Sequence, residues 1–191
     1  MVLPMVLLRM RDACFMAGDA VAGPVTLDLH AGGRGARVFA SSREASIVAM
    51  LAAGIAKASE GSVLIDEYDP RVQPVHVKRA AAFVPHDPLP LDEPGFERYI
   101  AYRAALWGID PMRALAHARL LLERLEGVHE AFAYPLAGAL IASPKLLVLD
   151  RPAIVYAERI LAAAGPRAIF STHTSEAAAE AFAPGRTTVP A

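Results

Sequence analysis

Short apolar runs alternate along the chain with longer segments whose apolar residues recur at helical spacing. Val25, Leu27 and Leu29 alternate with other residues, which predicts a strand within Val21–Leu29. Leu146–Leu149 is a continuous apolar run, typical of a parallel strand buried on both faces. Three further runs also predict strands: Ala36–Ala40, Ser62–Asp66 and Arg167–Ser171, and Lys78–Pro85 contains another strand that ends at its proline.

The intervening segments predict helices. Ser41 and Ser42 are good N-caps for the first of them, and Gly108 and Pro111 separate two helices in the middle of the chain. The helices are expected at Ser46–Lys57, with a stop near Gly54, and at Glu97–Trp107, Arg113–Leu125, Ile154–Ala164 and Ser175–Phe182. Alternating strands and helices predict an α/β fold with a parallel sheet, into which the helical middle is inserted.

Composition excludes several classes of protein. The 191 residues suit about one domain, and a hydrophobic content of 54% excludes disorder for most of the chain. The 19 Lys and Arg residues nearly balance 20 Asp and Glu, so no basic surface for nucleic acid is expected. The single cysteine, Cys14, excludes an intrachain disulfide and favours a reducing compartment.

No direct membrane span is expected. The longest relevant uncharged stretch, Ala131–Pro144, is interrupted by Pro135 and Gly138, whereas a spanning helix needs about 20 mostly apolar residues. The apolar start, Met1–Leu8, lacks a leading positive region, so a signal peptide is not expected.

The order of short motifs carries a family resemblance. The motif VFA leads into a helix that ends in LAAG. It is followed, in order, by GSVLID, FVPHD, a helical block, ALIASPKLLVLDRP and IFSTH. In this order they resemble the nucleotide-binding domain of ABC-transporter ATPases over almost the whole chain. The resemblance implies one domain, residues 1–191, with a P-loop NTPase-like parallel sheet, helices and an N-terminal antiparallel β part. A reduced helical subdomain is expected as an insertion at about residues 88–138.

The family's first phosphate-binding motif, G-x-x-x-x-G-K-S/T, is degenerate here. It falls on Phe39–Ile47, which reads FASSREASI. Ala45 stands at the lysine that would reach the phosphates, and Glu44 stands at the last glycine. Ser46 keeps the hydroxyl that the family uses for magnesium, and Arg43 is the candidate replacement for the lysine.

Other family positions are partly retained. Asp150 closes the apolar strand as the family's aspartate near magnesium does, but Arg151 replaces the next residue, a glutamate, and cannot accept a proton. His173 corresponds to the histidine of STH, and His86 stands where a glutamine follows FVP. Phe15 is the candidate aromatic for stacking adenine. No residue set has the spacing of a metal site.

The family's LSGGQ signature and the helix after it are expected to be deleted. Tyr134–Gly138 leads directly into Ala139–Ala142, which leaves no room for a helix, and Leu136–Gly138 is at most a vestige of the signature. In the family, ATP lies between the phosphate loop of one subunit and the signature of the other. A chain that lacks both would form no working site in a homodimer or with an intact partner.

The first functional hypothesis is therefore a non-hydrolytic subunit with no catalytic residue and no cofactor. It would act structurally or as a regulator on the cytoplasmic face of the cell membrane, bound to a transmembrane permease, a second nucleotide-binding subunit, or both. The resemblance places docking in a cleft beside the helical block. The candidate docking residues are His86, Phe96, Tyr99 and Trp107.

Two alternatives remain open. The first is a weak or atypical ATPase that binds Mg-ATP through the remaining polar side chains, namely Arg43, Ser46, Asp150 and His173. The second is a freestanding module in which the altered cleft binds another small ligand or a protein.

Overall fold

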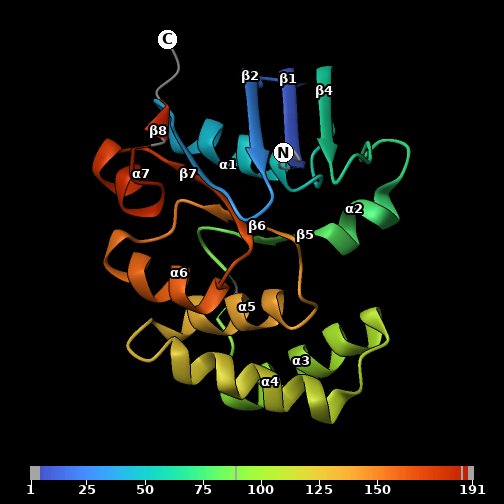
Figure 1. Cartoon of the computed structure of the whole chain (residues 1–191), viewed down its shortest axis with the longest axis vertical. Helices are drawn as coiled ribbons and strands as arrows, with labels where there is room; N and C mark the ends of the chain where they lie inside the picture. The colour runs from blue at the N-terminus through green and yellow to red at the C-terminus, as the bar shows by residue number, and fades with distance from the viewer. Residues whose placement is uncertain (1–4, 89, 186, 189–191) are drawn as a thin grey trace.

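Helix α1 (Ser42–Ala52) lies between two β-sheets in this computed structural model, which describes residues 5–88, 90–185 and 187–188 (Figure 1). One sheet is antiparallel, with the strand order β2-β1-β4. The other is parallel, with the order β5-β6-β7-β3-β8. This arrangement confirms the expected α/β fold and its N-terminal antiparallel part.

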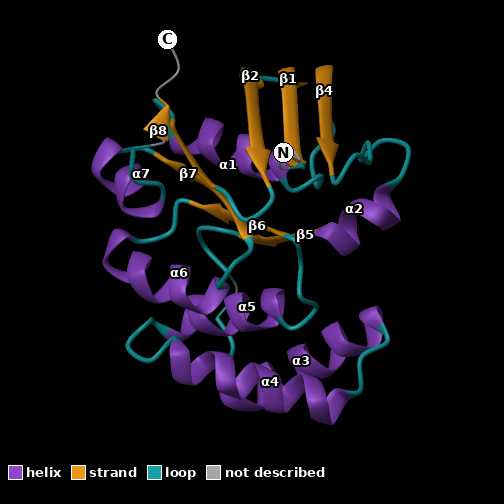
Figure 2. Cartoon of the chain, in the orientation of Figure 1, coloured by secondary structure: helices purple, strands orange, loops and turns teal. Residues whose placement is uncertain are grey.

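The strands of the two sheets, drawn in orange in Figure 2, are interleaved along the chain. The antiparallel strands are β1 (Val6–Ala17), β2 (Ala20–His30) and β4 (Glu60–Ile65). The parallel strands are β3 (Arg34–Val38), β5 (Ala81–Val84), β6 (Leu146–Asp150), β7 (Ala168–His173) and β8 (Thr187–Thr188).

The middle of the parallel sheet is buried on both faces, as its apolar sequence predicts. Every residue of β6 and β7 is buried. Leu146 and Val148 pack with α1, whereas Leu147 and Leu149 pack with helices on the opposite face. The alternation of side chains along one strand therefore joins two hydrophobic clusters through the sheet.

Three helices form the layer farthest from the antiparallel sheet: α3 (Glu93–Trp107), α4 (Pro111–Arg124) and α5 (Glu130–Leu140) (Figure 1). Asp92 and Asp110 cap α3 and α4, each accepting a hydrogen bond from a backbone N–H of the first turn. Gly108 ends α3 in the left-handed conformation, with φ of 63°. The remaining helices are α2 (Pro74–Ala80), the 3₁₀ turn η1 (Ile154–Tyr156), α6 (Ala157–Ala164) and α7 (Glu176–Phe182).

Helix α5 corrects the expectation that no helix fits before β6. Leu136–Gly138 lies inside α5 and is buried, so it is not an exposed signature loop. Pro135 also lies within the helix and removes one backbone hydrogen bond. Burial of Leu136 and Leu140 in the core compensates for that loss.

No helix among the described residues combines the length and the apolarity that a crossing of the bilayer requires.

We predict that Gly138→Ala destabilises the fold. A Cβ at this position would collide with Cε1 of Tyr99, a residue of α3 that packs against α5. Overpacking costs about 1–3 kcal/mol and exceeds the gain of up to about 1 kcal/mol from replacing a helical glycine. Urea denaturation should show the loss in the wild-type background and a smaller loss in a Tyr99→Leu background. Equal losses in the two backgrounds would exclude Tyr99 as the cause.

Candidate functional site

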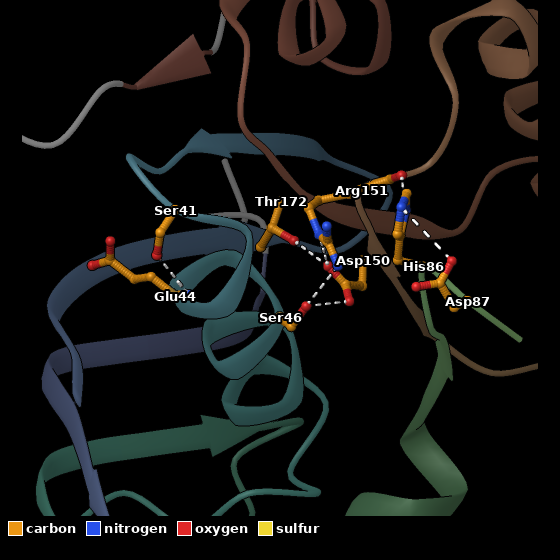
Figure 3. Close-up of polar contacts among 8 residues, drawn as sticks. All are labelled: Ser41, Glu44, Ser46, His86, Asp87, Asp150, Arg151 and Thr172. Carbon is orange, nitrogen blue, oxygen red and sulfur yellow. Dashed lines mark hydrogen bonds and ion pairs between the residues drawn. The ribbon is translucent and has the colours of Figure 1, made fainter. Parts of the chain in front are cut away.

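Two predicted site residues meet where β6 ends beside the first turns of α1 (Figure 3). Ser46 Oγ donates a hydrogen bond of 2.7 Å to Asp150 Oδ2. The Asp150 side chain is 5% exposed, so its carboxylate is almost entirely removed from solvent. A buried carboxylate must be paired to remain ionised without a large energetic cost, and the neighbouring groups meet that need.

Arg151 completes the pairing of this carboxylate. Its Nε donates to Asp150 Oδ1 at 3.0 Å, and its Nη2 donates to Ser46 Oγ at 3.0 Å. Thr172 Oγ1, from β7, makes a longer hydrogen bond of 3.4 Å to Asp150 Oδ1. Both carboxylate oxygens and the serine hydroxyl are therefore engaged by groups of the chain itself (Figure 3).

The segment expected to form the phosphate loop, Phe39–Ile47, is helical from Ser42 onward. Strand β3 ends at Val38 and α1 already begins at Ser42. The N-cap Ser41 accepts the Glu44 N–H with its hydroxyl and the Ala45 N–H with its carbonyl, each at 3.1 Å. The Ala45 side chain is fully buried in the core. The chain itself thus engages these two backbone donors, and the position expected for the lysine faces the interior.

Two other candidate residues lie apart from this cluster. Arg43 forms two hydrogen bonds of 3.1 Å with Asp19, which lies between β1 and β2. The Arg43 guanidinium lowers the pKa of the Asp19 carboxyl chiefly through these hydrogen bonds. Phe15 is half-buried on β1 and packs against the cluster that contains α1. The structure therefore brings together Ser46 and Asp150, but neither Arg43 nor Phe15.

His173 is a buried neutral group at the end of β7. It is 1% exposed, its Nε2 lies 2.8 Å from Ser171 Oγ, and its ring packs against Phe182 at 5.3 Å. Burial lowers the pKa of His173 to about 4, and the negative charge of Asp150 only partly opposes this effect. At neutral pH the imidazole adds no positive charge beside Asp150.

His86 connects the end of β5 to the cluster. Its Nδ1 lies 2.9 Å from the backbone oxygen of Arg151 (Figure 3). Its Nε2 is 3.9 Å from the exposed carboxylate of Asp87. No group of three or more His, Cys, Asp and Glu residues in the described part of the chain is arranged to hold a metal ion.

A groove lies on another face, between the end of α1, strand β5 and the end of α3. Its volume is about 570 Å³, and Ile55 and Leu106 on its lining are 58% and 56% exposed. Lys57, Lys78 and Arg103 also line it, and the described lining residues include no acidic side chain.

Of the predicted docking residues Phe96, Tyr99 and Trp107, only Trp107 lines the groove. Trp107 lines it, and Nε1 of this residue is buried without a hydrogen-bond partner among the described residues. Phe96 is 3% exposed and stacks on Tyr134, so it presents no surface to a partner. The ring of Tyr99 is partly buried and packs against Gly138 of α5.

Comparison with solved structures decides the fold. The ATP-binding subunit of an ABC transporter superposes with a TM-score of 0.75 at 16% sequence identity, covering 96% of this chain and 85% of that chain. This chain has the fold of the ABC-transporter ATP-binding cassettes. The resemblance seen in the sequence motifs is thereby confirmed at the level of the fold.

Two further structures have the same cassette fold. CbiO1 from Clostridium perfringens, part of the ABC transporter complex CbiONQ, matches with a TM-score of 0.66 and 17% identity over 88% of this chain and 78% of that one. A bacterial Atm1-family ABC exporter with ATP bound matches with a TM-score of 0.64 and 18% identity over 92% of this chain and 35% of the exporter. No model of a protein family matches the sequence, and no curated protein does.

We predict that the neutral state of His173 makes stability depend on pH. The unfolded state takes up a proton near pH 6.5, whereas folded His173 does so only near pH 4. The free energy of unfolding should therefore fall by about 3 kcal/mol as the pH drops through this window. Urea denaturation of the wild type and of His173→Gln measures the difference. Parallel pH profiles for the two proteins would contradict the prediction.

Proposed function

We propose that the protein is a non-hydrolytic ABC-type subunit that binds a transmembrane permease, or a second nucleotide-binding subunit, on the inner face of the cell membrane. Its role there is structural or regulatory. The observation that carries the proposal is that α1 already begins at Ser42, four residues before Ser46, so that little of Phe39–Ile47 remains as an open phosphate-binding loop.

A phosphate loop binds anions because several backbone N–H groups point at the ligand. Here Ser41 accepts the N–H groups of Glu44 and Ala45. Glu44 adds a carboxylate at the same turn, and its charge would repel a phosphate. Arg43 is turned toward Asp19 instead of Ser46, so it does not replace the absent lysine.

The chain also lacks the general base that ATP hydrolysis requires. Arg151 follows Asp150 directly, and its guanidinium cannot accept a proton from water. In the family, the signature immediately precedes a helix and the aspartate strand. The corresponding turn before α5 reads Glu126-Gly127-Val128-His129, with one glycine and no serine. His129 caps α5 by accepting the N–H of Ala131. This segment supports a site that does not close over a nucleotide.

The groove supports the docking part of the proposal. Apolar side chains that stay more than half exposed, Ile55 and Leu106, gain most when a partner removes them from water. The solved cassettes with this fold include subunits of transporter complexes. We therefore assign the groove as the surface that receives the partner.

We predict that the purified protein does not bind Mg-ATP. Ligand at 100 times its dissociation constant would stabilise the fold by about 2.7 kcal/mol, which a melting curve detects readily. Calorimetric and thermal-shift titrations with millimolar Mg-ATP should show neither heat nor a shift. An ATP-binding cassette with intact motifs, run in parallel, is the positive control. Magnesium-dependent stabilisation would favour the weak ATPase instead.

We also predict that charge in the groove abolishes docking. Ile55→Glu and Leu106→Glu place a carboxylate where apolar contact is expected, so each should abolish co-purification with a membrane-spanning protein from native membranes. Leu120→Glu is the matched control, because Leu120 is 55% exposed on α4 and does not line the groove. Equal recovery with all three variants would place docking elsewhere. Absence of any membrane partner with the wild type would favour the freestanding module.

A further inference from the structure

We propose that the Ser46–Asp150 pair is a cation site whose permanent occupant is the guanidinium of Arg151. In nucleotide-binding cassettes, a serine hydroxyl and an aspartate at these places serve a magnesium ion. The fold therefore implies a divalent cation, but the residues present do not fit one. This inference goes beyond the docking role and holds whether or not the groove receives a partner.

The contacts around Arg151 are those of a cation among oxygen ligands. Its Nε and Nη2 each lie 3.0 Å from an oxygen, one on Asp150 and one on Ser46. The other Asp150 oxygen is taken by the Ser46 hydroxyl at 2.7 Å. A metal ion would have to displace these hydrogen bonds and approach a fixed positive charge. Charge-assisted hydrogen bonds of this kind are among the stronger ones in proteins.

The backbone holds Arg151 in the orientation that makes these contacts. Its φ of 47° is left-handed, which is uncommon for a residue with a side chain. The Arg151 N–H donates to the Thr172 carbonyl at 3.0 Å, and the Arg151 carbonyl lies 2.9 Å from His86 Nδ1. The Arg151 side chain is 18% exposed. Thr172 of β7 and His86, which follows β5, thus engage the N–H and the carbonyl of Arg151.

The local charge balance supports the assignment. Asp150 is the buried carboxylate, His173 beside it is neutral, and Arg151 is the cation in contact with it among the described residues. His86 and Asp87, the other titratable groups facing this end of the sheet, are 42% and 92% exposed. A tethered guanidinium satisfies Asp150 without any ion from solution.

The first test removes the guanidinium and asks whether a free ion takes its place. Arg151→Met keeps most of the side-chain stem and leaves Ser46 and Asp150 intact. Electron paramagnetic resonance of Mn²⁺ should show no uptake by the wild type at millimolar Mn²⁺ and uptake of one ion by Arg151→Met. The double variant Asp150→Asn/Arg151→Met should lose this uptake, because the anionic ligand is gone.

The second test adds a free guanidinium ion to Arg151→Met and measures the melting temperature. Arg151→Met should melt roughly 5–10 °C below the wild type, because it leaves a buried carboxylate unpaired. Methylguanidinium at millimolar concentration should recover part of the loss, whereas methylammonium should recover less. Methylguanidinium should not raise the melting temperature of the double variant Asp150→Asn/Arg151→Met. If Arg151→Met does not fold alone, circular dichroism should show methylguanidinium restoring its structure.

Arg151→Lys keeps a positive charge but presents a single donor group. It should exclude Mn²⁺ like the wild type and melt between the wild type and Arg151→Met. The proposal is wrong if the wild type takes up Mn²⁺ as readily as Arg151→Met. It is also wrong if neither Mn²⁺ nor methylguanidinium stabilises Arg151→Met. Mg-ATP binding is measured separately, so failure here leaves the non-hydrolytic role to its own test.

Discussion

The buried carboxylate of Asp150 is the constraint around which the centre of the molecule is arranged. It sits at the end of a strand that is buried along its whole length, where an unpaired charge would cost several kcal/mol. Its partners come from three elements: Ser46 from α1, Thr172 from β7 and Arg151 just after β6. The same contacts that neutralise the charge therefore also fix α1 against the parallel sheet.

Much of the fold could be predicted because its central strands carry strong local signals. Leu146–Leu149 is continuously apolar and ends in a charged residue, and the structure makes it β6. Strand β1 was missed because its pairing with β2 shifts register at several places, which breaks the alternation that marks a strand. Helix α5 was missed because Pro135 and Gly138 resemble breaks, while burial against the core holds the helix together.

The candidate site was predictable in its residues but not in its contacts. Matching the chain to the family's motifs identified Ser46 and Asp150 as candidate residues, and their side chains form a hydrogen bond in the structure. Arg151 was noted as the loss of a base, and no local signal revealed that its side chain folds back onto Asp150. That direction depends on a left-handed backbone held by Thr172 and His86, which lie far away in the sequence. Arg43 was the candidate replacement for the phosphate-loop lysine, but its side chain pairs instead with Asp19 in the turn between β1 and β2.

Trp107 has a consequence of a different kind. It is the one tryptophan of the chain, and it lines the groove with an indole nitrogen that has no hydrogen-bond partner among the described residues. Indole fluorescence responds to the polarity and hydrogen bonding around the ring, and here it arises from one position. The protein thus carries an intrinsic optical reporter at the groove, whose emission follows the filling of that surface without any added label.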